Sequence, residues 1–507
     1  MKKYASVHSV SLKGLSATRI VVESSIDTRS VYNDIEIIGL GDAAVKESKR
    51  RVRSALTHAG FPFPEGRIVV NLAPSDLKKE GSGFDLPIAL SILKAAGQLE
   101  ATEGNFYFLG ELGLNGEMRR VRGVLPMVAS LPHGSVVVVP RSNAGEASLV
   151  KNVVTYAFDH LKEVVAFLEN QIHVDPIEPR NISGCIPVYD VDMSDVKGQQ
   201  LAKRALEIAA AGGHNVLLIG SPGSGKTMLA RRFPTILPPM GEEEILETTK
   251  IYSVAGLLPP DGILLERPFR SPHHTASTAA LVGGGNDARP GEISLSHNGV
   301  LFLDEFPEFK RDVIEALREP METGRITVAR AKQSVSYPAV FTLIAAQNPC
   351  PCGWYGDSEH ACTCSINDIK RYNRKISGPI LDRIDIYVNV PRLTYEEYRS
   401  MNPGESSEKI RERVVEARLI QQKRFSETRV RTNARMNGKL LNKVITLDER
   451  SESLLKDAMK RFAMTGRAVE KVLKVARTIA DLENSERLQY HHLMEALQYR
   501  MRSEELN

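Results

Sequence analysis

The segment best equipped for chemistry is a glycine-rich loop that follows a short apolar run, Asn215–Ile219. Glycines at this spacing let backbone N–H groups turn inward around phosphate oxygens. Lys226 can reach the outer phosphates, and the Thr227 hydroxyl can bind Mg²⁺. A chance glycine turn is the alternative, but the preceding apolar strand and the complete spacing favour binding of ATP or GTP. The loop consists of Gly220, Ser221, Pro222, Gly223, Ser224, Gly225, Lys226 and Thr227.

A second segment, further along the chain, can supply the acids that hydrolysis needs. The apolar run Gly299–Leu303 ends in Asp304 and Glu305. Asp304 can hold Mg²⁺ directly or through water, and Glu305 can orient and deprotonate the attacking water. A buried strand followed by surface acids is the alternative, and the phosphate loop upstream favours the catalytic interpretation. The next apolar run, Phe341–Ala346, leads to Asn348, which we expect beside the γ-phosphate, where it can position water.

Arg383 stands in the segment Gly378–Asp385, just before another apolar run. At this point the sequence resembles the AAA+ ATPases, and within them the group shared by magnesium-chelatase ATPase subunits and replicative helicases of the MCM type. The resemblance implies that Arg383 is an arginine finger that reaches the ATP of a neighbouring subunit. A surface ion pair with Asp382 or Asp385 is the alternative. The resemblance also implies that Arg467, at the start of a long predicted helix, is a second sensor over the phosphates.

A closer resemblance covers nearly the whole chain. It rests on Arg270–Ser277, Gly283–Gly285 and Pro290–Leu295 before the two acids, and on Val69–Pro74 and Lys79–Pro87 near the amino terminus. In these segments the sequence resembles the YifB/ComM family of magnesium-chelatase-like proteins. The resemblance implies a hexameric, ATP-driven DNA motor that promotes branch migration when incoming single strands recombine with the chromosome during natural transformation.

Two adjacent histidines, His273 and His274, suggest a metal site at first sight. No acid or cysteine stands at ligand spacing from them, so we expect a structural or loop role instead. The long stretch between Lys226 and Asp304 leaves room for the helical insert that is typical of the magnesium-chelatase group.

The amino-terminal part of the chain also resembles the proteolytic domain of Lon. In that family a serine follows a lysine-acid-glycine turn by two residues, and a lysine further along serves as its base. Here Gly83 stands at the serine position, Leu125 stands at the lysine position, and Ser82 is one position away. A serine without a base is an unactivated alcohol. We therefore expect a Lon-like fold without peptidase residues, whose work is binding or assembly.

Four of the five cysteines form two close pairs, Cys350 with Cys352 and Cys362 with Cys364. Four thiolates suit a tetrahedral Zn²⁺ ion, although these pairs are tighter than the usual C-x-x-C. Free thiols or a reversible disulfide are the alternatives. Cys185 stands alone in a proline-rich stretch and is predicted to have no such role.

The segment Arg325–Tyr337 alternates like a β-hairpin, and its tip carries Arg330 and Lys332. In the helicase branch of the resembling group the equivalent hairpin points into the central channel of a ring, so these two side chains could follow DNA phosphates. Such contacts are salt-sensitive and independent of sequence. A solvated hairpin tip is the alternative. Two further basic stretches are weaker candidates, Lys370–Lys375 and the scattered bases from Arg411 to Lys443.

The composition gives little information about partners. The chain has 507 residues, of which 25% are charged and 42% hydrophobic, and its net charge is only +4. Any contact with DNA must therefore rest on local clusters. No run of about 18 apolar residues is present, which predicts a cytoplasmic protein without a membrane partner. Five cysteines in so long a chain do not make a disulfide framework.

We predict an α/β protein in which an AAA+ P-loop core with a helical lid follows a Lon protease-like (ribosomal S5-like) α/β domain that lacks peptidase residues. The expected parts are a domain at 1–170, a linker at 171–190, a core at 191–402 with a zinc loop at 350–364, and a helical lid domain at 403–507. Predicted strands are Arg19–Val22, Ile35–Leu40, Ile68–Leu72, Phe106–Leu109 and Val136–Val139. Predicted helices are Asp42–Ala59, Asp85–Ala96, Glu408–Phe425, Leu447–Phe462, Arg467–Leu482 and Tyr490–Met501.

Together these patterns predict an ATPase that uses ATP and Mg²⁺, assembles as a homo-oligomeric ring, and acts on single-stranded and branched DNA without sequence preference. Three rival functions stay open: a chelatase-type remodeller that acts on a protein partner, a Lon-like protease, and a binding module that binds nucleotide without turning it over. The residues expected at one ATP site are Lys226, Thr227, Asp304, Glu305 and Asn348 from one subunit and Arg383 from the next.

Overall fold

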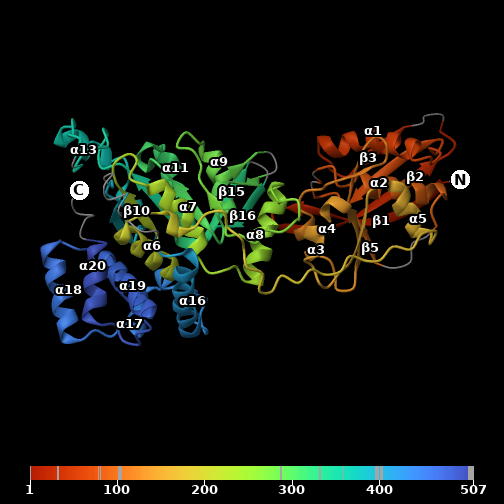
Figure 1. The fold of residues 1–507 in the computed structure, drawn as a ribbon. Helices are drawn as coiled ribbons and strands as arrows, with labels where there is room; N and C mark the ends of the chain where they lie inside the picture. The colour runs from red at the N-terminus through yellow and green to blue at the C-terminus, as the bar shows by residue number, and fades with distance from the viewer. Residues whose placement is uncertain are drawn as a thin grey trace.

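The computed structural model describes residues 2–30, 34–77, 79, 81–100, 105–285, 288–330, 333–357, 359–393, 399 and 404–500. Three parts follow one another along an elongated molecule (Figure 1). A sheet domain at the amino terminus lies at one end, a second sheet domain lies in the middle, and a group of helices lies at the other end. Among the described residues, no helix has the length and apolar character needed to span a membrane.

The amino-terminal domain is built on a mixed seven-stranded sheet. Its two longest strands form an antiparallel hairpin, and every second residue at the end of β2 is buried, as expected for a strand that covers a core on one face. Helix α2 packs on this hairpin. In spatial order the strands are β3 (Ile35–Ile38), β4 (Arg67–Ala73), β2 (Ser16–Asp27), β1 (Lys2–Lys13), β5 (Phe106–Phe108), β8 (Val136–Pro140) and β9 (Val154–Phe158). The helices are α1 (Ala43–His58), α2 (Asp85–Ala96), α3 (Val124–Ala129), α4 (Ala144–Ala147) and α5 (Leu161–Leu168).

The central domain has a five-stranded sheet whose paired strands are all parallel. Strands β10, β14 and β17 are buried along their whole length, which explains their continuous apolar sequences. In spatial order the strands are β11 (Phe269–Arg270), β14 (Val300–Leu303), β17 (Thr342–Gln347), β10 (Val216–Ile219) and β18 (Ile386–Asn389). The helices are α6 (Gln200–Gly212), α7 (Lys226–Ile236), α8 (Glu242–Ala255), α9 (Thr278–Val282), α10 (Glu292–Leu295), α11 (Arg311–Glu315), α12 (Arg318–Thr323), α13 (Ile366–Asn373) and α14 (Gly378–Leu381).

The carboxyl-terminal helices share a hydrophobic core with the central sheet. Val475 and Ile479 of α19 belong to the same buried cluster as Ala209 of α6 and Val216 of β10. Helices α16 and α19 both pack on α6. The helices of this part are α16 (Ser407–Arg424), α17 (Gly438–Val444), α18 (Glu449–Arg461), α19 (Gly466–Leu482) and α20 (Tyr490–Gln498).

The amino-terminal domain docks on the helix α8 of the central domain. Helix α3 packs on α8, and Val124 lies in one buried cluster with Ile245. The buried Glu146 carboxylate accepts hydrogen bonds from Asn143 in its own domain and from the Ser253 hydroxyl of α8. Desolvation raises the pKa of Glu146, and these hydrogen bonds act against that shift. The interface is therefore both apolar and specifically hydrogen-bonded.

The predicted fold class is confirmed, with a parallel P-loop sheet behind a separate α/β domain. Each predicted strand overlaps an observed one, and the predicted helices coincide with observed helices to within about two residues, except that Met501 lies outside the described residues. Strand β3 ends before the predicted Leu40 because Gly39 turns the chain at φ +104°. The sequence prediction missed β1 and β9.

A buried charge network holds the helical part together. The Asp481 carboxylate accepts hydrogen bonds from Arg424 at 2.8 Å, from Arg477 at 2.9 Å and from Asn433 at 2.7 Å. The side chain of Asp481 is fully buried, and that of Arg477 is 2% exposed. A carboxylate at this point compensates two guanidinium groups from different helices.

We expect Asp481→Asn to lower the free energy of unfolding of the helical part by about 3–5 kcal/mol, because it leaves buried guanidinium groups without a counter-charge. Urea unfolding followed by circular dichroism would measure this loss. Asp457→Asn, at an exposed position of α18, is the matched control and should change little. Equal stability of the two variants would contradict the structural role given to Asp481.

Candidate functional site

Three polar segments meet at the carboxyl edge of the central sheet. The phosphate loop, Gly220–Thr227, follows β10, the two acids follow β14, and Asn348 follows β17. These strands are parallel neighbours, and Ile219 at the end of β10 lies opposite Gln347 at the end of β17. Parallel strands in this register end at one edge of the sheet, so segments far apart in the sequence form one site.

The phosphate loop fits an anion. Gly223 and Gly225 have φ values of +77° and +93°, and a Cβ added at either position would meet nothing within 4 Å. The buried Ser224 hydroxyl has no hydrogen-bond partner among the described residues. Helix α7 begins at Lys226, so its first N–H groups and the positive end of its dipole face the loop. Backbone and side-chain donors thus surround open space, as phosphate binding requires.

The Lys226 ammonium group lies inside this loop. It donates hydrogen bonds to the carbonyl oxygens of Gly220 at 2.7 Å and Ser221 at 3.0 Å, and to Asn348 Oδ1 at 3.2 Å. Burial lowers the pKa of Lys226, and the two acids after β14 oppose that shift. The lysine of the phosphate loop and the asparagine after β17 therefore reach the same point.

The residues predicted to hold Mg²⁺ are in direct contact. Thr227 Oγ1 donates a hydrogen bond to Asp304 Oδ2 at 2.7 Å. The second carboxylate oxygen of Asp304 accepts the backbone N–H of Glu305 at 2.9 Å. Hydroxyl and carboxylate oxygens are ligands that Mg²⁺ prefers, and the ion usually completes its shell with water and phosphate oxygens. This pair fits Mg²⁺, which would neutralise charge on a bound triphosphate.

Glu305 has an unusual backbone conformation for a residue with a side chain. Its φ is +51°, and its side chain is 55% exposed at the end of a buried strand. Strained conformations of this kind persist where the surrounding structure fixes them, and they occur often at active sites. The Glu305 carboxylate acts on the phosphate loop, since its charge helps to raise the pKa of Lys226 against the effect of burial.

His274 contacts this carboxylate. Its Nδ1 lies 3.1 Å from Glu305 Oε2, whereas His273 Nδ1 bonds instead to Thr275 Oγ1 at 2.9 Å. The contact arises because β11 is a parallel neighbour of β14, so the segment after β11 ends beside the acids. Both histidines were predicted to have only a structural or loop role, and this contact was not predicted, since nothing in their spacing points to Glu305.

Arg383 lies at the opposite edge of the sheet from the phosphate loop of its own chain. It precedes β18, whose first residue Ile386 pairs with Val216 at the start of β10. Its guanidinium group donates to the Pro379 carbonyl at 2.7 Å and to Glu322 at 2.6 Å. The ion pair considered as an alternative therefore exists, but its acid is Glu322 and neither neighbouring aspartate.

The structure places Arg467 away from the phosphate loop of its own chain, and its role as a second sensor stays a prediction. Its side chain is 80% exposed, and its nearest acid is Asp382 at 4.0 Å, beside Arg383. The reason is the docking of α19, where Lys471 donates to the Ile384 carbonyl at 3.1 Å. Arg467 thus lies at the amino edge of the sheet and not over the phosphate loop of its own chain.

The four clustered cysteines form a site of the right size for zinc. Cys350 Sγ lies 3.3 Å from Cys352 Sγ and 3.7 Å from Cys362 Sγ, and all four sulfur atoms lie within 4.8 Å of one another. A tetrahedron with Zn–S bonds of about 2.3 Å has sulfur atoms about 3.8 Å apart, whereas a disulfide needs about 2.05 Å. A hydrogen bond from the Trp354 backbone is the first cause that lowers the pKa of Cys352, to about 5. The cluster fits Zn²⁺ bound by four thiolates.

A second cluster, Glu483 with His491 and His492, does not fit a metal. His492 Nδ1 accepts the backbone N–H of Gln489 at 2.9 Å, so its Nε2 carries the proton and donates to Glu483 at 3.0 Å. A metal would need the lone pair that this proton occupies. The cluster is a hydrogen-bonded contact between α19 and α20.

The predicted hairpin is present. Strands β15 (Arg325–Arg330) and β16 (Gln333–Pro338) are antiparallel, with Arg330 opposite Gln333. Lys332 lies outside the described residues, as does the side chain of Arg330, so their contact with DNA stays a prediction.

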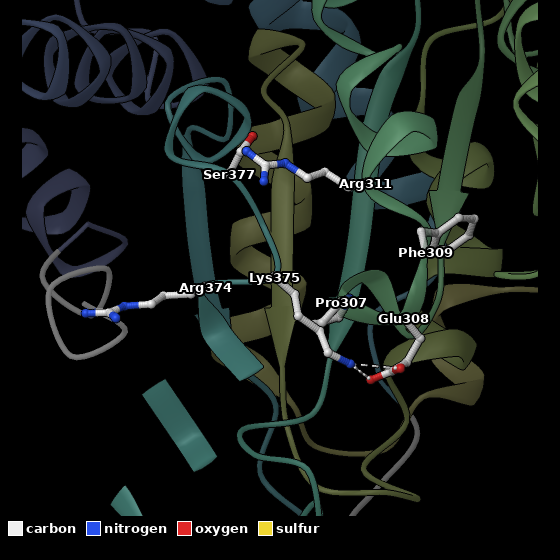
Figure 2. Close-up of a pocket in the computed structure, with 7 residues that line it drawn as sticks. All are labelled: Pro307, Glu308, Phe309, Arg311, Arg374, Lys375 and Ser377. Carbon is white, nitrogen blue, oxygen red and sulfur yellow. Dashed lines mark hydrogen bonds and ion pairs between the residues drawn. The ribbon is translucent and has the colours of Figure 1, made fainter. Parts of the chain in front are cut away.

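A basic pocket of about 390 Å³ lies just after the two acids, between the segment that follows β14 and the segment before α14 (Figure 2). Lys375 pairs with Glu308 at 2.9 Å on one side of the pocket. Arg311 extends toward Ser377, and Arg374 extends away from the other side chains. Neither arginine has an ion-pair partner among the described residues, so both guanidinium groups are available to an anion.

The amino-terminal domain contains no peptidase dyad at the Lon positions. A Cβ on Gly83 would contact Val121 Cγ1 at 3.0 Å, and the Leu125 side chain is fully buried. The neighbouring Ser82 hydroxyl donates to Glu111. The described residues thus leave Ser82 without the lysine base of Lon.

Models of known protein families match all three parts of the chain. The family described as "Magnesium chelatase, subunit ChlI" matches residues 192–398, "Subunit ChlI of Mg-chelatase" matches residues 22–143, and "Magnesium chelatase, subunit ChlI C-terminal" matches residues 404–500. The five-stranded parallel sheet, the phosphate loop and the acids after β14 define an AAA+ ATPase of the magnesium-chelatase type.

Relatives that align over nearly the whole chain identify the family within this class. The chain is 42% identical to "Uncharacterized protein YifB" of Salmonella typhimurium and 42% identical to "Competence protein ComM" of Haemophilus influenzae, in each case over 98% of this chain and 97% of the relative. It therefore belongs to the YifB/ComM family. The "Magnesium-chelatase 67 kDa subunit" of Chlorobaculum parvum is 29% identical over only 31% of this chain.

We expect His274→Ala to lower kcat for ATP by about tenfold while leaving KM little changed, because the imidazole orients the Glu305 carboxylate and does not contribute to the phosphate loop. Steady-state ATP hydrolysis by the purified protein would measure both constants. His273→Ala removes the adjacent imidazole that bonds to Thr275, and it should behave like the unmodified protein. A rise in KM without a change in kcat would exclude the positioning role.

Proposed function

We propose that this protein is a DNA motor that hydrolyses ATP with Mg²⁺ and drives branch migration or unwinding when incoming DNA recombines during natural transformation. In this proposal six copies form a ring. The observation that supports it most strongly is the division of the ATP machinery between the two edges of one sheet. Head-to-tail packing of identical subunits would place the Arg383 edge of one copy against the phosphate-loop edge of the next.

In the proposed cycle each residue of the phosphate-loop edge has one task. Lys226 and the loop N–H groups bind the phosphates, and Thr227 and Asp304 hold Mg²⁺. Glu305, oriented by His274, accepts a proton from the attacking water, and Asn348 positions that water. Arg383 from the neighbouring subunit would stabilise the charge that develops on the transferred phosphoryl group.

Several features support DNA as the partner. In sequence, Arg330 and Lys332 stand at the predicted tip between β15 and β16, and basic hairpin tips in a ring channel could follow the phosphates of one strand. The basic pocket of Figure 2 adds the Arg311 guanidinium group, which has no ion-pair partner in the part of the chain that the structure describes. One relative is named as a competence protein, which is consistent with a role in transformation. We also propose that the four clustered cysteines bind a structural Zn²⁺ ion.

A second candidate function is remodelling of a protein partner, as in chelatase-type machines. The descriptions of the matching families favour it, since all three refer to a magnesium-chelatase subunit. The basic hairpin favours DNA instead. A Lon-like protease is opposed by Gly83 and by the buried Leu125.

We expect single-stranded or forked DNA to stimulate ATP hydrolysis several-fold, because a DNA motor couples ATP hydrolysis to its movement along the bound DNA. Hydrolysis by the purified protein, measured with and without DNA, tests this expectation. Lys226→Ala should abolish turnover at every DNA concentration. Glu305→Gln should still bind ATP but hydrolyse it about 10²–10⁴-fold more slowly.

Each other outcome has a distinct meaning. A rate of ATP hydrolysis that does not change when DNA is added would favour the function of remodelling a protein partner. A Glu305→Gln protein that keeps its full biological function would identify a binding module that needs no hydrolysis. Peptide cleavage that survives Ser82→Ala would show that the comparison with Lon was aligned wrongly.

We expect Arg383→Ala to reduce hydrolysis by about 10³-fold or more while nucleotide binding persists, because an arginine finger acts on the transition state. Mixing tests whether it acts between subunits. Arg383→Ala subunits have intact phosphate loops, and Lys226→Ala subunits have intact fingers, so mixed rings should regain part of the activity that each variant lacks. Arg141→Ala, which removes an exposed arginine paired with Asp159 in the amino-terminal domain, is a matched control. No recovery on mixing would place Arg383 outside the shared site.

A further inference from the structure

The segment that carries the four cysteines, residues 350–364 and hereafter the cysteine loop, lies directly against the phosphate loop. Gly353 has φ +86°, and a Cβ at this position would come within 2.7 Å of Pro222 Cδ. Only a glycine allows this approach of the two loops. The contact follows from the order of the chain, because the cysteine loop begins just after Asn348 at the same edge of the sheet.

An acid inside the cysteine loop lies beside the phosphate loop. The Asp357 side chain is 4% exposed. Its carboxylate accepts the backbone N–H groups of Glu359 and His360, each at 3.0 Å. The nearby Ser221 side chain is the first cause that lowers the pKa of Asp357, to about 2. Asp357 thus shapes the loop between the two cysteine pairs where that loop faces the phosphate loop.

The same two loops line a pocket of about 480 Å³, which is within the size range of small-molecule sites. The phosphate loop contributes Gly220 and Ser221, and the cysteine loop contributes Tyr355 and Gly356. The Tyr355 side chain is exposed, so its aromatic face is available to a planar ring.

Gln199, at the start of α6, supplies a polar group to this pocket. Its Nε2 donates to the Pro391 carbonyl at 2.5 Å, which fixes the amide. Its Oε1 is buried and accepts no hydrogen bond from the described residues. An unsatisfied buried acceptor is costly, and an exocyclic amino group of a base would satisfy it. The pocket thus combines an aromatic wall, one acceptor and the adjoining phosphate loop, as a nucleotide with an amino-bearing base requires.

We propose that the cysteine loop is a metal-held wall of the nucleotide pocket, so that Zn²⁺ on the four thiolates controls how tightly the protein binds ATP. The proposal rests on the function proposed above and adds a means of control to the same site. The metal fixes both ends of the loop, and the residues between the two cysteine pairs place Tyr355 in the pocket and Asp357 beside the phosphate loop. Loss of the metal releases these two side chains and weakens nucleotide binding, although no zinc ligand touches the nucleotide.

The chain contains its own reporter for this coupling. Trp354 is its only tryptophan, and its ring stacks on His360 of the same loop, with ring centroids 4.2 Å apart and an interplanar angle of 21°. Tryptophan emission from the full-length protein therefore reports only on the cysteine loop.

The test measures metal content and nucleotide affinity separately. The full chain is titrated with a non-hydrolysable ATP analogue and Mg²⁺ while Trp354 emission is recorded, and anisotropy of a fluorescent ADP gives an independent affinity. The protein as purified is compared with chelator-treated protein and with the double variant Cys362→Ser, Cys364→Ser. We expect bound zinc in the first sample alone, and a Kd for nucleotide that is about tenfold weaker in the other two.

Further variants keep the test informative if the cysteine variant does not fold. Tyr355→Ala and Asp357→Asn should keep their zinc and still bind nucleotide several-fold more weakly. Cys185→Ser, which removes the cysteine outside the loop, should match the unmodified protein in zinc content and Kd.

Two sets of results distinguish a failure of this proposal from a failure of the ATPase function on which it rests. If protein without zinc binds nucleotide as tightly as protein with zinc, or if the protein as purified holds no zinc, the coupling is wrong while the ATPase proposal stands. If zinc-loaded protein binds no ATP analogue, or if Lys226→Ala binds it equally well, the proposed ATP site itself is wrong.

Discussion

The candidate site depends on the parallel register of three short strands. The four residues of β10 and of β14 rise only about 13 Å, so a shift of one pairing would move the phosphate loop, the acids and Asn348 out of reach of one another. The hydrogen bonds from Thr227 to Asp304 and from Lys226 to Asn348 show that the observed register brings the three segments within side-chain reach of one another. The complete burial of β10, β14 and β17 stabilises this arrangement, because each apolar strand is covered on both faces.

The same sheet also separates the predicted arginine finger from the phosphate loop of its own chain. Parallel strands have two unlike edges, and side chains at one edge cannot reach the other. Arg383 and Arg467 both lie at the amino edge, the first bonded to Glu322 and the second beside Asp382. Both arginines are exposed or half-buried and lie at the edge away from the phosphate loop. This position suits a site that a second copy completes, and it requires no rearrangement within one subunit.

Local sequence patterns predicted most elements of the fold, but they could not predict contacts between segments that are far apart in the sequence. The phosphate loop, the acids, the hairpin and the cysteine pairs are each continuous in sequence, so their residue types and spacing were sufficient. The contact of His274 with Glu305 depends on the pairing of β11 with β14, and that of Gly353 with Pro222 depends on how a long loop folds back. The position of Arg467 depends on a contact of the same kind, since its helix was predicted from a local pattern but the docking of that helix against Ile384 was not. Strand β1 was missed because its polar and apolar residues follow a lysine-rich start that resembles an exposed terminus.

The amino-terminal domain is connected to the site through two contacts with different mechanical consequences. Its helix α3 packs on α8, where Glu146 bonds to Ser253, and α8 in turn contacts Leu295 through the Tyr252 hydroxyl, just before β14. The tip of its β1–β2 hairpin reaches further, since a Cβ on Gly14 would come within 2.2 Å of Val335 in β16. The domain therefore contacts the hairpin predicted to meet DNA directly, and it is linked through α8 to the segment before the acids. Leu15, beside Gly14, also packs on the buried clusters that contain Val335 and Tyr252. If the hairpin moves during the proposed ATP turnover, it must either carry the amino-terminal domain with it or break the contacts of Gly14 and Leu15.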